Sequence, residues 1–271
     1  MSKYNKITEE PSNYDSLEKM ETISILESMN TEDKKVAAAV EMTIPQITKL
    51  VDALALRFQQ GGRLFYIGAG TSGRLGILDA SEIPPTFGMP HDRVIGIIAG
   101  GDGAIRKAVE GAEDDTQQAW KDLLIHEPTE NDTVIGIAAS GTTPYVLGGV
   151  AAAMNNGLLT GCITNNPDSP LTMAVEIPIA INVGPEFVTG STRMKSGTSQ
   201  KLVLNMISTA LMIKIGRVKG NKMVNMQLSN KKLVDRGTRY LVEALEIPYD
   251  DAERLLQLHG SVKKAIDAYQ K

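Results

Sequence analysis

The chain has 271 residues, of which 42% are hydrophobic and 22% charged, a composition typical of soluble globular proteins. A net charge of −4 argues against a protein that mainly neutralises nucleic-acid phosphates, so no nucleic-acid partner is expected. The single cysteine, Cys162, excludes an intramolecular disulfide, and the three histidines lie too far apart in the sequence to predict a zinc site.

The first residues lack the apolar core region of a signal peptide. No run of about 18 apolar residues occurs along the chain, so no membrane span is predicted either. We therefore expect a cytoplasmic protein with no membrane partner.

The N-terminal part of the sequence predicts an arm followed by helices. Residues 1–14 are polar and read as the arm. Apolar residues at helical spacing predict a first helix after Ser16, and Thr31 is expected to open a second one. The second helix is expected to bend near Pro45 and to stop at Gly61.

The middle of the chain alternates short apolar runs with helical stretches. The runs are continuous rather than alternating, which is typical of parallel strands buried on both faces. They cover residues 63–68, 93–100, 133–140, 159–164 and 177–183, and the helical stretches between them cover 72–81, 103–124, 144–156 and 169–175. This alternation predicts a doubly wound α/β fold with a five-stranded parallel sheet, whose ligands bind beyond the carboxyl ends of the strands.

A long helix is expected over residues 195–214, followed by a tail of three short helices over 231–271. We therefore divide the chain into three parts. An N-terminal arm and helices that pack on the core occupy residues 1–60, an α/β domain occupies 61–225, and a small helical tail occupies 226–271.

The loop after the first run is rich in glycine and hydroxyl groups. Residues 68–73 fit the G-x-G-x-x-G pattern of dinucleotide-binding loops, but Asp102 comes too late to be the acidic residue that those sites require. Thr71 and Ser72 lie where a helix is expected to begin, and hydroxyl and N–H groups there suit a phosphate monoester. We therefore favour a phosphate site over a dinucleotide site.

Two later loops are also rich in hydroxyl groups. Ser140, Thr142 and Thr143 follow the third run, where helix capping alone would explain them. Two such loops at the ends of two central strands favour an anion site instead. The segment after the fifth run carries hydroxyls and cations, among them Ser191 and Lys195, and is expected to close the same pocket.

Two glutamates are candidates for proton transfer. Glu82 is flanked by Ile83 and two prolines, so we expect it to be partly desolvated, which would raise its pKa and suit a general acid. Glu113 lies among other acidic residues, and composition alone assigns it to a solvated helix face.

Longer strings identify a family. The second loop SGTT and the five-stranded alternation resemble sugar isomerase (SIS) domains, which bind phosphosugars. The strings IGAGTSGRLGILDASEIPPTFG at 67–88 and GPEFVTGSTRMKSGTSQKLVLNMISTALMIKIGRVKGNKMVNMQ at 184–227 are more specific. They resemble the N-acetylmuramic acid 6-phosphate etherase family, and the resemblance extends over nearly the whole chain.

This resemblance implies an activity and a site. The family cleaves the D-lactyl ether at C3 of its substrate, giving N-acetylglucosamine 6-phosphate and D-lactate in peptidoglycan recycling. It implies that Glu82 is the proton donor and Glu113 an acid/base residue, which overturns the composition-based interpretation of Glu113. It also implies phosphate contacts from Ser72, Ser140 and Thr143, and no metal or organic cofactor.

Two alternatives stay open. Eukaryotic glucokinase regulatory proteins resemble this family but sense phosphosugars without catalysis, and an aldose–ketose isomerase could use the same fold. The regulatory proteins carry two such domains, whereas this chain carries one, which favours an enzyme that forms a homodimer. Both candidate glutamates, Glu82 and Glu113, also favour catalysis. The helical tail resembles a small ubiquitin-associated bundle, for which packing is the simplest role.

Overall fold

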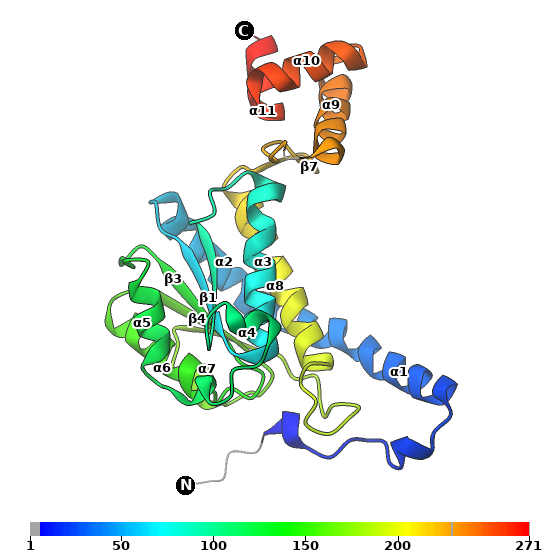
Figure 1. The fold of residues 1–271 in the computed structure, drawn as a ribbon, viewed down its shortest axis with the longest axis vertical. Coiled ribbons are helices and arrows are strands. Elements are labelled where there is room, and N and C mark those ends of the chain that lie inside the picture. Colours follow the sequence, from blue (N-terminus) through cyan, green and yellow to red (C-terminus); the bar gives the residue numbers. More distant parts are fainter. Residues whose placement is uncertain (1–5, 229, 271) are drawn as a thin grey trace.

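The computed structural model describes residues 6–228 and 230–270. Five parallel strands form one sheet in the order β2-β1-β3-β4-β5 (Figure 1). Their bounds are β1 Leu64–Gly68, β2 Val94–Ile98, β3 Thr133–Ile137, β4 Leu159–Thr164 and β5 Ile177–Ala180. Each strand lies within one of the apolar runs of the sequence, so the predicted five-stranded parallel sheet is confirmed.

Helices cover both faces of the sheet, which makes the fold doubly wound. The helices α2 (Ile44–Gln59), α3 (Gly70–Phe87) and α8 (Lys195–Lys214) pack on one face, and α5 (Gln118–Leu124), α6 (Pro144–Asn155) and α7 (Pro170–Met173) lie on the other. Alternate residues of β1 enter the two cores: Leu64 and Tyr66 face α3, whereas Phe65 and Ile67 face α6. This two-sided burial explains why the strand sequences are apolar without alternation.

The N-terminal helices divide at a different place from the one expected. The helix α1 (Thr22–Glu41) continues through Thr31, so the predicted boundary there is wrong. The hydroxyl of Thr31 donates to the Glu27 carbonyl inside the helix instead of capping a new one. The chain breaks at Met42 and Thr43, and Pro45 then lies in the first turn of α2, where its missing N–H breaks no helical bond.

The single helix expected over residues 103–124 is also wrong. The structure has a short α4 (Gly103–Arg106), a 3₁₀ turn η3 (Ala112–Asp114) and then α5. Gly111 adopts a left-handed φ of +73°, which interrupts any helix at that point. Glu113 therefore lies on an isolated turn and not on a solvated helix face.

The C-terminal part contains the long helix α8, a small hairpin and three more helices. The bounds of α8 agree with the prediction, and the hairpin strands β6 (Val218–Lys219) and β7 (Lys222–Met223) follow it. The three predicted tail helices are α9 (Lys231–Leu245), α10 (Tyr249–His259) and α11 (Val262–Tyr269), which surround an apolar cluster of their own. They lie at one end of the molecule, beyond α3 (Figure 1). Within the described residues, none of the helices is long and apolar enough to span a membrane.

Candidate functional site

A cavity of about 200 Å³ lies at the carboxyl ends of the neighbouring strands β1 and β3. The helices that follow these two strands, α3 and α6, leave toward opposite faces of the sheet, which opens a crevice between their first turns. The cavity is lined by hydroxyl and carboxylate side chains as well as backbone: Glu9, Thr71, Ser72, Glu113, Ser140, Thr143 and Thr192.

The first wall of the cavity is the N-terminus of α3. Ala69 caps the helix without a side-chain hydrogen bond, and the first helical bond runs from the Gly73 N–H to the Ala69 carbonyl. The N–H groups of residues 70–72 precede that bond and lie at the positive end of the helix dipole. This wall can therefore bind an anion through backbone groups.

The Ser72 hydroxyl belongs to a buried hydrogen-bond chain. It donates to Gln200 Oε1 at 2.9 Å, and Gln200 Nε2 donates to Asn165 Oδ1 at 3.1 Å. Asn165 Nδ2 in turn donates to the Ile181 carbonyl at 3.2 Å, an oxygen that can only accept, so the direction of the whole chain is determined. The Ser72 proton is thus used by Gln200, and the group that Ser72 offers to an anion here is its backbone N–H.

The second wall is the loop between β3 and α6. Ser140 Oγ accepts from the Thr142 N–H at 3.2 Å and from the Thr142 hydroxyl at 3.1 Å. Thr142 therefore shapes the loop and does not line the cavity. Thr143 is the N-cap residue of α6 but makes no side-chain cap bond, so its hydroxyl, which lines the cavity, is not accounted for by capping.

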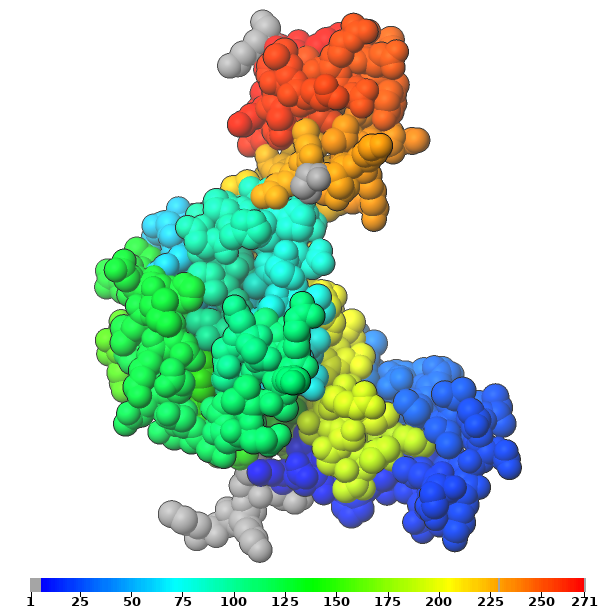
Figure 2. Space-filling view, viewed as in Figure 1, coloured from blue at the N-terminus to red at the C-terminus, as the bar shows by residue number. Residues whose placement is uncertain are grey.

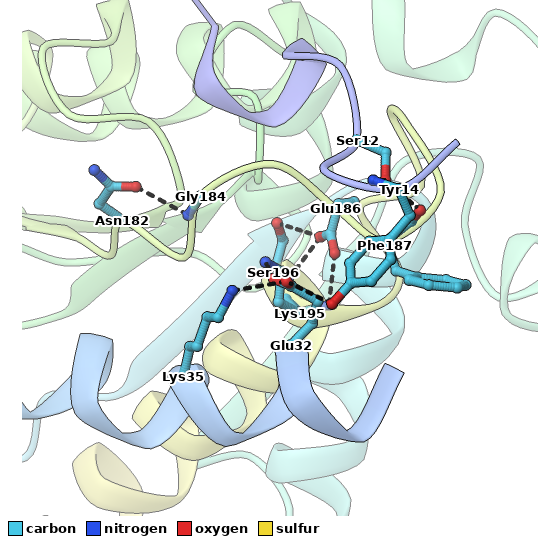
Figure 3. Close-up of polar contacts among 10 residues, drawn as sticks. All are labelled: Ser12, Tyr14, Glu32, Lys35, Asn182, Gly184, Glu186, Phe187, Lys195 and Ser196. Atoms are coloured by element: carbon cyan, nitrogen blue, oxygen red, sulfur yellow. Dashed lines mark hydrogen bonds and ion pairs between the residues drawn. The ribbon is translucent and has the colours of Figure 1, made fainter. Parts of the chain in front are cut away.

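The third wall is the loop of residues 184–194. Thr192 lines the cavity, whereas Ser191 does not and forms a turn through its N–H bond to the Val188 carbonyl at 2.9 Å. Lys195 also lies outside the cavity. The residue is 1% exposed, and its ammonium pairs with Glu32 Oε2 at 2.5 Å (Figure 3).

The Lys195–Glu32 pair explains why Lys195 does not help to close the cavity, as was expected of its segment. A buried ammonium needs a carboxylate partner, and the ion pair with Glu32 supplies it. Burial alone would raise the pKa of Glu32, but the bonds from Lys195 and Lys35 outweigh burial and hold that pKa below its usual range. We therefore leave Lys195 out of the phosphate site.

The two candidate glutamates are not brought together within one chain. Glu113 lines the cavity from η3. Glu82 lies ten residues beyond Ser72 on α3, roughly 15 Å along the helix, and does not line the cavity. Ile83 and Pro84 are buried against the core, whereas Glu82 is exposed. The prediction that Glu82 is partly desolvated is therefore wrong for the single chain.

Two lining residues were not singled out from the sequence. Thr192 belongs to the hydroxyl-rich segment after β5, in which no local signal favours it over Ser191. Glu9 lies in the arm, about 130 to 180 residues before Ser140 and Thr192, which line the same cavity, so no local pattern could have found it. Among the described residues, no group of three or more His, Cys, Asp and Glu side chains is placed to hold a metal ion.

Several curated proteins are similar to this chain over most of their length. An N-acetylmuramic acid 6-phosphate etherase of Bacteroides fragilis is 64% identical over 265 residues, covering 98% of this chain and 94% of that protein. The protein of the same name from Porphyromonas gingivalis is 62% identical, covering 98% of this chain and 97% of the relative. The protein of this name from Yersinia pestis is 53% identical, covering 92% of this chain and 85% of the relative.

Comparisons with a family model and with solved structures agree on the fold. Residues 46–154 match the model of the glucokinase regulatory protein N-terminal SIS domain. A phosphoheptose isomerase from Francisella tularensis superposes with a TM-score of 0.52 at 18% identity, covering 71% of this chain and 98% of that one. One from Neisseria gonorrhoeae gives a TM-score of 0.52 at 14% identity, with 70% and 97% covered. The central sheet and its helices therefore have the SIS fold.

Proposed function

Because the chain belongs to the N-acetylmuramic acid 6-phosphate etherase family, we propose that it cleaves the D-lactyl ether of this sugar phosphate. The products are D-lactate and N-acetylglucosamine 6-phosphate, and the role is the recycling of cell-wall sugar. The observation that carries the proposal is the identity of 64% over 98% of the chain. The SIS fold and the hydroxyl-lined cavity support it.

The 6-phosphate is assigned to the first two walls of the cavity. The N–H groups of residues 70–72 offer donors at a helix N-terminus, which is a common arrangement for phosphate. The hydroxyls of Thr71, Ser140 and Thr143 add further polar groups within the same cavity. Binding the phosphate at one end fixes the distant C2 and C3 atoms, so that binding energy contributes to catalysis.

The ether at C3 is a poor leaving group for direct displacement, so we propose elimination followed by addition. When the ring opens, C1 becomes an aldehyde and the C2 proton becomes acidic. A carboxylate removes that proton, the C3–O bond breaks, and an acid protonates the departing lactate oxygen. Water then adds to C3 of the α,β-unsaturated aldehyde. Glu113 and Glu82 are the acid–base groups, and each such group typically contributes about 10²–10⁴-fold.

Completion of the site by a second copy explains the position of Glu82. Exposed apolar side chains lie on the helices next to the cavity: Leu78 on α3, and Met206 and Ile213 on α8. Figure 2 shows a hollow between α1 and the C-terminal helices, bordered by α3 and α8.

We therefore propose a homodimer in which α3 meets α3 of the partner. A two-fold axis near residue 76 would pair the helices antiparallel, because 76 is midway between 70 and 82. Glu82 of each chain would then lie beside the first turn of the partner's α3 and face its cavity. A cytoplasmic location belongs to the same proposal, because a sugar phosphate does not cross the apolar interior of a membrane unaided.

Incubation with N-acetylmuramic acid 6-phosphate in ¹⁸O-water tests the function. The purified protein receives no added metal or nucleotide, and D-lactate and the mass of the N-acetylglucosamine 6-phosphate are measured. We expect release of D-lactate, with the ¹⁸O in the sugar, because the bond that breaks is C3–O. Absence of lactate together with saturable binding of the phosphosugar would contradict the proposal and favour a regulator like the glucokinase regulatory protein.

A further inference from the structure

The N-terminal arm, here residues 6–14, is fixed against the wall of the cavity. Thr8 is fully buried, and its hydroxyl accepts from Asn166 Nδ2 at 2.9 Å. The same Nδ2 donates to the Ala139 carbonyl at 2.8 Å, and Ala139 lines the cavity. The Thr8 N–H also donates to Asn166 Oδ1 at 3.3 Å. One buried amide thus joins the arm directly to the β3 wall.

The far end of the arm is held on the loop of residues 184–194. The Ser12 hydroxyl donates to the Phe187 carbonyl at 2.7 Å, and the Ser12 N–H donates to Thr189 Oγ1 at 2.9 Å. The rings of Tyr14 and Phe187 pack with centroids 4.9 Å apart (Figure 3). The Tyr14 hydroxyl also donates to Glu32 at 3.3 Å, so the arm reaches the buried Glu32–Lys195 pair.

These anchors on both sides place Glu9 in the cavity. Glu9 lies between Thr8 and Ser12, and it lines the same cavity as Ser140, Glu113 and Thr192. Its side chain is exposed, and no hydrogen bond or ion pair engages its carboxylate within residues 6–228 and 230–270. A glycine faces it across the cavity edge: a Cβ at Gly190 would lie 3.3 Å from Glu9 Oε2.

We propose that Glu9 is a substrate-binding residue whose carboxylate accepts hydrogen bonds from neutral donors of the sugar. This inference rests on the proposed function. The substrate carries two anionic groups, the phosphate and the lactyl carboxylate, and a carboxylate repels both. Hydroxyl and acetamido N–H groups are the remaining donors, and an ionised carboxylate can only accept. Glu9 therefore recognises the sugar ring and its acetamido substituent, and not its charged ends.

Glu9→Gln tests this assignment with the shape of the side chain retained. Glu18→Gln is the matched control, because Glu18 is an exposed carboxylate that follows the same arm and does not line the cavity. The measurement is the dissociation constant of N-acetylglucosamine 6-phosphate, which keeps the ring donors, and of inorganic phosphate, which lacks them. Calorimetry provides both constants, and thermal denaturation shows whether each variant is folded.

We expect Glu9→Gln to weaken binding of the phosphosugar about 10- to 100-fold, as for loss of a hydrogen bond to a charged group. Binding of inorganic phosphate should be unchanged, and Glu18→Gln should resemble the unmodified protein. Phosphosugar binding that survives Glu9→Gln unchanged would overturn the role of Glu9 alone. Equal weakening for inorganic phosphate would overturn it as well, since the effect would then be on the phosphate wall. An unmodified protein that binds no phosphosugar would instead overturn the proposed function.

Discussion

Asp79 is a carboxyl group placed where water has almost no access. It lies on the sheet-facing side of α3 and is 4% exposed. The Tyr66 hydroxyl and the Ser208 hydroxyl each donate to it at 3.1 Å. Burial disfavours the charged form more than these bonds favour it, and the pKa of Asp79 is raised to about 6. Burial likewise raises the pKa of Tyr66, which therefore stays protonated as the donor.

This raised pKa makes the stability of the protein depend on pH. The folded state binds the Asp79 proton more tightly than the unfolded state, whose pKa is near 3.8, so the contribution is full below about pH 4 and is lost as pH rises through 6. Between pH 8 and pH 5 the free energy of unfolding of the unmodified protein should rise by about 1–2 kcal/mol, an increase that Asp79→Asn lacks. Urea unfolding at pH 8 and at pH 5 measures this difference in the free energy of unfolding. Asp92→Asn, at an exposed position, controls for removal of one charge, and an equal pH response in both variants would contradict the assignment.

Ser140 is the hydroxyl whose loss should affect the phosphate most directly. Ser140→Ala should weaken the binding of N-acetylglucosamine 6-phosphate about 10- to 100-fold, because a hydrogen bond to a charged group is lost. N-acetylglucosamine, which lacks the phosphate, should bind both proteins equally, and a similar loss for this sugar would refute the phosphate contact. Thr142→Val is the control, since Thr142 touches Ser140 but does not line the cavity.

At the scale of elements, the N-terminus of α8 is capped from a distance. Met194 occupies the cap position and makes no side-chain bond. Fully buried Glu186 takes this role, accepting from the N–H groups of Lys195 and Ser196 at 2.9 Å each and from the Ser196 hydroxyl at 2.8 Å (Figure 3). A carboxylate at this position also interacts favourably with the positive end of the helix dipole. The cap therefore fixes the loop that carries Thr192.

Glu186→Gln should destabilise the protein by about 1–3 kcal/mol, because a buried amide group replaces an acceptor that satisfies three donors. Urea unfolding at pH 7 measures this loss. Glu176→Gln is a weaker perturbation for comparison, since Glu176 accepts a single bond from the Thr160 N–H at 3.1 Å. If both variants unfold at the same urea concentration, the cap contributes no more than a single partly buried bond.

The element boundaries show which local sequence signals were enough to predict a helix or a strand. Apolar runs and helix stops fixed all five strands and α8, because burial on two faces leaves a continuous pattern. The helix predicted over residues 103–124 is wrong because the chain breaks at the left-handed Gly111 and at Asp115, whose carboxylate accepts from the N–H groups of Gln117 and Gln118. Side-chain to backbone hydrogen bonds stabilise such a turn in place of a helix, and the spacing of apolar residues does not predict them.

At the scale of the whole molecule, we expect the proposed catalytic arrangement to require a second copy of the chain. Glu82 and Glu113 lie apart in one chain, so a shared site predicts complementation between inactive variants. Glu82→Gln should retain substrate binding and lose turnover, and Glu113→Gln should also lose turnover. In a mixed dimer, one of the two sites would contain both intact glutamates.

Unfolding and refolding the two variants together, in equal amounts, should restore about a quarter of the normal activity. Half of the dimers are then mixed, and each mixed dimer has one intact site of two. D-lactate release measures the recovery, and each variant refolded alone provides the baseline. Activity that stays at this baseline, in a sample shown to be dimeric, would mean that both glutamates act within one chain.

The sequence by itself determined the layers of the fold and the family of the protein. Continuous apolar runs are typical of strands buried on two faces, and the long strings around Glu82 and Lys195 are specific to one family. Thr71, Ser72, Ser140 and Thr143 could be placed at one cavity because neighbouring parallel strands end at the same edge of a sheet.

Only the tertiary structure decided which polar side chains face that cavity. Lys195 turns to the buried Glu32, and Glu82 lies too far along α3 to reach the cavity of its own chain. Glu9 enters from the arm, held there by Asn166. The partners that place Lys195 and Glu9 lie more than 100 residues away in the sequence, and periodicity and local motifs carry no information about such partners.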